Sequence, residues 1–114
     1  MLSMIPWDYN LAFGTFQGGD ANGQVNFPID TPVSSGMDDR PMVDWIFTDE
    51  EYTELYHKLF REFMSQTDFA SIISETAELI KDYVEKDPTK FCTYEEFETG
   101  VAAITQLCTL RAES

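Results

Sequence analysis

The chain has 114 residues, 43% of them apolar, which is enough for one domain with a buried core and too few for two. Its 21 acidic residues outnumber 7 basic ones and give a formal net charge of −14 at pH 7. A negative field of this strength opposes binding to nucleic acid or to an anionic membrane surface, so we expect neither as a partner.

The first predicted element is the end of a strand over residues 2–5, closed by Pro6. Asp8 follows at the strand exit, where metal and phosphate ligands are common, and it stands among the aromatic residues of segment 7–13. An ionised carboxylate in such surroundings needs a cation or several N–H donors. Two readings stay open. Asp8 is a ligand, or Asp8 and Asn10 form an Asx-type turn that only satisfies the local backbone.

Residues 14–41 are predicted to form a long irregular loop, because glycine and proline recur throughout them. A loop of this length inside a compact domain is usually functional or mobile. The alternation of apolar residues over 25–29 favours a short extended segment, which Pro28 limits to a sheet edge. Acidic loop residues can line a cation site with Asp8, but solvated loop acids are several times commoner, so we assign none of these four to a site: Asp20, Asp30, Asp38 and Asp39.

Two helices are predicted next. Pro41 stands near the first turn of a short helix that runs to Phe47. Thr48 and Glu51 form a capping-box pattern, which opens a helix from about 49 to 64. Apolar residues recur every three or four positions along this second helix and are assigned to the core; they are Tyr52, Leu55, Tyr56, Leu59, Phe60 and Phe63.

Two further helices are predicted in the second half of the chain. The third covers 69–86 and is stopped by Pro88, and a second capping box of Thr93 and Glu96 opens the last. Gly100 weakens that helix by about 1 kcal/mol relative to alanine and is a candidate for a close approach by a neighbouring element. The expected fold class is therefore mainly α, with a short N-terminal strand and a long irregular loop followed by about four helices.

Nucleophilic catalysis and zinc binding find no support in the sequence. The single histidine, His57, falls outside the apolar stripe of its helix and reads as a surface residue rather than a ligand. Cys92, Cys108 and His57 lack the spacing of a zinc site. On a continuous helix the two cysteine Cα atoms would lie roughly 24 Å apart, well beyond the roughly 7 Å limit of a disulfide, so we expect no pairing.

Residues 5–19, IPWDYNLAFGTFQGG, closely resemble the signature segment of the spore coat protein H (CotH) family of atypical, protein-kinase-like enzymes. Segments 40–47 and 51–57 are similar to the C-terminal part of that family, and the likeness extends along essentially the whole chain. The resemblance implies part of an atypical protein-kinase-like C-lobe. It also implies that Asp8 matches the Asp of the protein-kinase DFG motif, which holds the magnesium that bridges the nucleotide phosphates.

The resemblance also implies missing parts. Family members are several times longer, and their nucleotide-gripping lysine, its acidic partner and the catalytic-loop Asp lie upstream of the matching segment. We therefore predict a C-terminal fragment that is inactive alone, with 1–41 carrying the metal-site motif and 42–114 forming a helical support region. The full-length parent is expected to phosphorylate protein serine or threonine with ATP and Mg²⁺, which should not bind tightly to this chain alone. Its expected partners are the missing N-terminal kinase-like region and the protein substrate.

The alternative is a non-catalytic acidic helical module that binds another protein or stabilises a larger assembly. Exposed aromatic residues would favour it, since a fragment of a larger lobe presents an apolar patch where the missing part docks. The same patch is a candidate surface for a homodimer. A spore coat or cell-surface location is implied only by the family resemblance.

Overall fold

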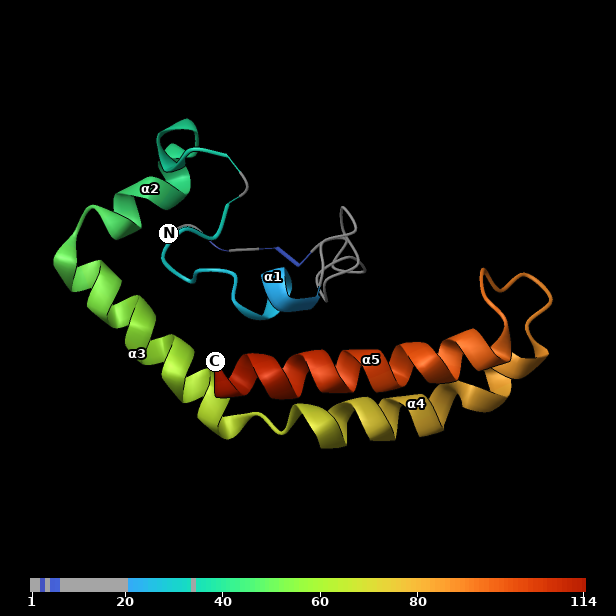
Figure 1. The fold of residues 1–114 in the computed structure, drawn as a ribbon. Coiled ribbons are helices and arrows are strands. Elements are labelled where there is room, and N and C mark those ends of the chain that lie inside the picture. The colour runs from blue at the N-terminus through green and yellow to red at the C-terminus, as the bar shows by residue number, and fades with distance from the viewer. Residues whose placement is uncertain (1–2, 4, 7–20, 34) are drawn as a thin grey trace. The chain divides into compact units, whose positions relative to one another are not determined.

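The computed structural model describes residues 3, 5–6, 21–33 and 35–114. In this part of the chain the structure is mainly helical and contains no strand (Figure 1). The elements are α1 (Ala21–Val25), the 3-10 helix η2 (Met37–Asp39), α2 (Pro41–Phe47), α3 (Glu50–Gln66), α4 (Phe69–Lys86) and α5 (Tyr94–Glu113). The predicted mainly α class is confirmed. Leu2 and Met4 of the predicted strand lie outside the described residues.

The chain divides into two compact units. One contains α1, α4 and α5, and the other contains η2, α2 and α3. The chain passes from the first unit to the second after Asn26 and returns to the first at Phe69.

In the first unit, α4 and α5 lie side by side as an antiparallel hairpin (Figure 1). The bounds of α4 are those predicted, and α5 begins at the predicted capping box. The Glu96 N–H donates to Thr93 Oγ1 at 3.1 Å, and the Thr93 N–H donates to Glu96 Oε2 at 2.7 Å. Cys108 is the one buried side chain among the described residues, at 9% exposed. Half-buried apolar residues mark the packed sides; they are Phe69, Ile73, Ala77 and Val84 on α4 and Phe97, Val101, Ile104 and Leu107 on α5.

The short helix α1 packs at the C-terminal end of α5. The Arg111 guanidinium donates to the Val25 carbonyl oxygen at 2.5 Å, and Ser114 Oγ donates to the same oxygen at 3.1 Å. These bonds satisfy a carbonyl that the last turn of a helix leaves without an internal partner. The prediction of irregular loop is therefore wrong over α1 and η2, and the predicted extended segment from residue 25 is wrong because Val25 ends a helix.

The connection between α4 and α5 is held by local polar contacts. Asp87 Oδ1 accepts hydrogen bonds from the Thr89 N–H at 2.8 Å and from the Thr89 hydroxyl at 2.7 Å. Lys90 Nζ donates to the carbonyls of Glu85 and Asp87, both at 3.1 Å. A lysine in this position satisfies the last carbonyls of a helix. The end of α4 is thereby fixed by residues of the connection itself.

In the second unit, Pro41 occupies the start of α2 as predicted, but the predicted capping box of α3 is wrong. Thr48 Oγ1 donates to the Trp45 carbonyl at 3.1 Å, so its hydroxyl serves the end of α2. Asp49 caps α3 instead, because its Oδ1 accepts from the N–H groups of Glu51 at 3.0 Å and Tyr52 at 3.2 Å. An ionised carboxylate at this position also benefits from the helix dipole, which favours aspartate over threonine as the cap.

Aromatic contacts join α2 to α3. The rings of Trp45 and Tyr52 lie 4.9 Å apart between centroids at an interplanar angle of 79°. Phe47 and Tyr56 lie 5.1 Å apart at 78°. Edge-to-face pairs of this kind add stability beyond the apolar area that they bury.

The predicted core stripe of α3 is only partly covered. Tyr56 and Phe60 are half-buried on the side that faces α2. The remaining four residues are between 45% and 55% exposed: Tyr52, Leu55, Leu59 and Phe63. Assigning the whole stripe to the core is therefore wrong, because the seven residues of α2 cover one side of α3 and leave the other open.

Gly100 lies within α5 with open space beside it. A Cβ added there meets no described atom within 4 Å, apart from the backbone of the helix itself. The predicted close approach by a neighbouring element is therefore wrong. Among the helices that the structure describes, none has both the length and the apolar character needed to span a membrane.

Candidate functional site

Asp8, the predicted magnesium ligand, lies outside the described residues, as does Asn10. Its assignment therefore stays a prediction that rests on the sequence segment around it. In the described part of the chain, no group of three or more histidine, cysteine, aspartate or glutamate side chains is placed to hold a metal ion.

The loop acids do not gather in one place within the described residues. Asp38 and Asp39 are exposed neighbours in η2. Asp30 instead contacts α3, where its carboxylate meets an imidazole. Asp20 lies outside the described part of the chain.

Two adjacent contacts hold the loop around residue 30 against α3. The Tyr56 hydroxyl donates to the Ile29 carbonyl at 3.1 Å. Next to it, His57 Nε2 lies 2.5 Å from Asp30 Oδ1, and both side chains are partly exposed. The sequence identified His57 as a surface residue but missed its partner, because no local pattern links positions 27 residues apart. We call this pair of contacts the loop anchor.

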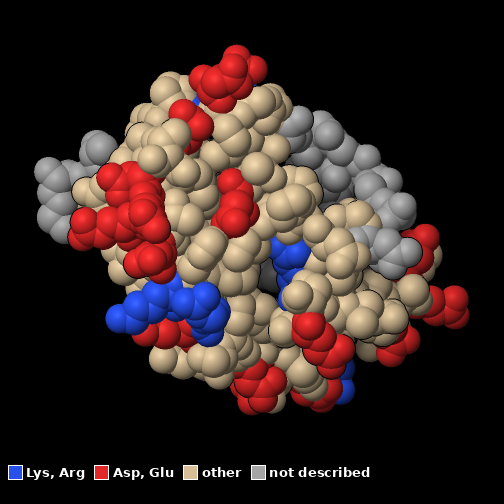
Figure 2. All heavy atoms as spheres, turned by 60° about the vertical axis from the view of Figure 1, so that its left-hand side comes forward, with Lys and Arg blue, Asp and Glu red and all other residues tan. Residues whose placement is uncertain are grey.

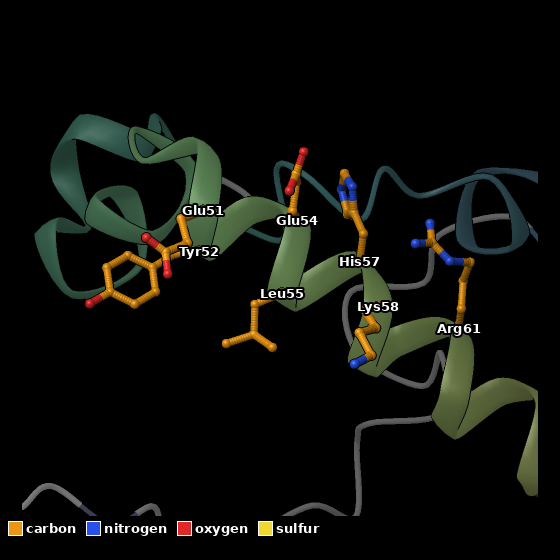
Figure 3. Close-up of a pocket in the computed structure, with 7 residues that line it drawn as sticks. All are labelled: Glu51, Tyr52, Glu54, Leu55, His57, Lys58 and Arg61. Carbon is orange, nitrogen blue, oxygen red and sulfur yellow. The ribbon is translucent and has the colours of Figure 1, made fainter.

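A shallow pocket runs along α3 (Figure 3). Its lining residues are Glu51, Tyr52, Glu54, Leu55, His57, Lys58 and Arg61. Figure 3 shows that Glu54, His57 and Arg61 project from one side of the helix, while Leu55 and Lys58 project from the other. All seven belong to one helix, whereas enclosed ligand sites have polar groups that converge from several elements. The described lining residues include no serine, threonine or cysteine for nucleophilic catalysis.

The surface charge is mainly acidic. Figure 2 shows Asp and Glu side chains in several groups over the visible face, with Lys and Arg in fewer places. Several basic side chains are engaged within the chain: Lys81 pairs with Glu78, Lys90 binds helix carbonyls and Arg111 binds Val25. Such a surface attracts cationic partners and repels anionic ones.

Both cysteines are free thiols, which confirms the prediction that they do not pair. Cys92 is half-buried in the connection before α5. Burial raises the pKa of the Cys108 thiol above its usual value, so this thiol is a poor nucleophile near neutral pH. Cys108 therefore lacks the surroundings of a reactive cysteine.

Comparison with known proteins adds one finding. The model of the family described as CotH kinase protein matches residues 1–114. No curated protein and no solved structure matches the chain. The family match covers every residue and includes the segment around Asp8 from which the resemblance is evident. The chain belongs to the CotH kinase protein family.

Proposed function

We propose that the chain is the C-terminal part of a CotH-type atypical protein kinase, in which Asp8 binds magnesium. The observation that carries the proposal is the family match over residues 1–114. The complete enzyme would transfer the γ-phosphate of ATP to serine or threonine hydroxyls of a protein. Within these residues, the segment from Trp7 to Gly14 is the most specific piece of the resemblance.

A carboxylate such as that of Asp8 is the kind of ligand that Mg²⁺ takes in nucleotide sites, where one or two protein carboxylates suffice beside phosphates and waters. Magnesium supplies charge neutralisation at the phosphates when it is bound. Asp8 would stay ionised and would not accept a proton from the substrate. Its role is to position the metal, while the groups that grip the nucleotide and orient the hydroxyl come from outside this chain.

The burial pattern supports the role of a part within a larger domain. Among the described residues only Cys108 is buried, although α3 carries the large apolar side chains of Leu55, Leu59 and Phe63. Amphipathic helices gain most of their stability from tertiary packing of their apolar faces. We propose that further kinase-like residues complete this packing and the nucleotide site together.

The test is phosphate transfer from γ-labelled ATP to serine- and threonine-containing proteins, by the longest natural protein that carries these residues. Asp8→Asn should abolish transfer while the circular dichroism spectrum stays unchanged. Asp39→Asn, which neutralises an exposed loop acid, is the matched control and should retain activity. Full activity of the Asp8→Asn protein would refute the assignment. The 114-residue chain alone should transfer no phosphate.

A further inference from the structure

Helix α4 has apolar residues on two sides. One side packs on α5 through half-buried residues such as Ile73. On the other, Ile72, Leu79 and Tyr83 are 53%, 73% and 75% exposed. Their spacing of seven and four residues places them in one row along the helix. We call these three residues the α4 stripe.

The hairpin does not need the α4 stripe for its own packing, because α5 packs on a different side of α4, where Ile73 and Ala77 are half-buried. Contiguous exposed apolar groups on a helix mark contact surfaces in soluble proteins. The stripe is also rigid before any contact forms, since it lies on a helix of 18 residues whose end is fixed by Asp87 and Lys90. A partner that docks here therefore spends little free energy on ordering this surface.

The charges beside the stripe indicate which partner fits. By helix periodicity Glu75 and Asp82 flank the row on one side. A small pocket at its C-terminal end is lined by Leu79, Tyr83, Asp82, Lys86 and Asp87. Acidic groups thus predominate around the stripe, as they do in the whole chain with its net charge of −14. Complementary positive charge on the partner would strengthen the contact and speed association.

We propose that the α4 stripe is a docking surface for an amphipathic helix of another protein, with apolar residues along one side and lysine or arginine beside them. The stripe extends from residue 72 to residue 83, a rise of roughly 16 Å along the helix, so the partner helix needs about three turns. A second copy of this chain is disfavoured because it would bring the same acidic flanks into contact. The proposal does not depend on phosphate transfer or on Asp8.

The experiment uses two synthetic helical peptides as long as α4, which share one row of leucines and carry either lysine or glutamate beside it. Fluorescence anisotropy measures their binding to the whole chain and to two variants. Leu79→Asp places a charge in the stripe, and Met42→Asp places the same charge on α2 at a residue that is 71% exposed. The lysine peptide should bind the unaltered chain and the Met42→Asp variant with similar affinity. Leu79→Asp should weaken binding about tenfold or more, and the glutamate peptide should not bind.

Circular dichroism establishes that Leu79→Asp and a second variant, Tyr83→Gln, keep their helix content. Both variants should bind the lysine peptide more weakly than the unaltered chain does. Raising the salt concentration should weaken this binding further. Equal affinities for Leu79→Asp and Met42→Asp would show a general charge attraction and overturn the proposal. A dimer in sedimentation equilibrium that Leu79→Asp dissociates would also overturn the proposal. Protection of Tyr83 from oxidative labelling in the chain alone would overturn it as well.

Discussion

Asp30 Oδ1 and His57 Nε2 lie 2.5 Å apart, which joins a loop carboxylate to the single histidine of the chain. The neighbouring bond from Tyr56 to the Ile29 carbonyl makes this a two-point attachment. Two adjacent contacts restrict a loop more than one contact does, because the second contact prevents the loop from rotating about the first. The loop anchor therefore defines the path of the chain before η2.

Replacing His57 by alanine should loosen this loop without unfolding α3. Both partners are partly exposed, so the pair should contribute about 0.2–1 kcal/mol. Amide hydrogen exchange at Ile29, Asp30 and Thr31 should become up to about fivefold faster. Lys58→Ala is the control, since Lys58 Nζ lies 3.9 Å from Glu62 on the same helix and away from the loop. Equal exchange rates in the two variants would contradict a role for the histidine.

The capping box of α5 predicts that two Thr→Ala substitutions in the same helix change the free energy of unfolding differently. Thr93→Ala removes the hydroxyl that accepts the Glu96 N–H and should lower the free energy of unfolding by about 1 kcal/mol. Thr99→Ala, inside the same helix, removes only a bond to the Glu95 carbonyl and should be neutral or slightly stabilising. Urea unfolding followed by circular dichroism measures both. A destabilisation of equal size at both positions would argue against the cap.

Gly100→Ala should stabilise the chain by about 1 kcal/mol. The added methyl group meets no described atom within 4 Å beyond the helix backbone, so nothing in the described residues opposes it. The reverse change, Ala103→Gly at an exposed position of α5, should destabilise by a similar amount. Urea midpoints of the two variants should therefore move in opposite directions. A loss of stability in Gly100→Ala would reveal an unseen neighbour at this position.

The Asp87 carboxylate should make stability depend on pH in acid. The Thr89 hydroxyl bond, followed by the Thr89 N–H, lowers the pKa of Asp87 below its usual 3.8. Because the folded pKa is the lower one, the stabilisation is complete above the usual value and disappears as the pH falls through the lowered value. At about pH 6 the melting temperature of Asp87→Asn should therefore be lower than that of the unaltered chain. At about pH 2 the two melting temperatures should be equal.

Thr89→Val separates the hydroxyl bond from the charge of the aspartate. It removes the first cause of the lowered pKa while the backbone N–H bond remains. Its melting temperature should therefore show a weaker dependence on acid pH than that of the unaltered chain. A difference between Asp87→Asn and the unaltered chain that is constant from about pH 6 to about pH 2 would contradict the linkage.

The elements that sequence reasoning placed correctly depend on local signals. Pro88 stops α4, and the residues of the second capping box are three positions apart, so neither needs knowledge of the tertiary structure. The cap of α3 was predicted one residue early because Thr48 and Asp49 are both good caps, and only the bond of Thr48 to Trp45 distinguishes them.

The features that sequence reasoning missed depend on distant partners. Helix α1 is completed by Arg111, which is 86 residues from Val25. Leu59 is exposed because the short α2 covers only part of α3. The periodicity of apolar residues does not show how much of a helix its neighbour covers. The same limit applies to Asp8. The resemblance of one segment predicts this carboxylate as a metal ligand, whereas the other ligands of such a site would be brought together only by the tertiary structure.

The burial of Cys108 has a consequence for how the α4–α5 hairpin can be followed in solution. The residue is 9% exposed, and burial raises the pKa of its thiol, so a thiol reagent should modify it only when the helices separate. In a Cys92→Ser variant, the rate of modification should equal the opening rate at high reagent concentration. At low reagent concentration it should be proportional to the equilibrium constant of opening. The chain thus carries its own reporter of local unfolding, at the one described side chain that solvent scarcely reaches.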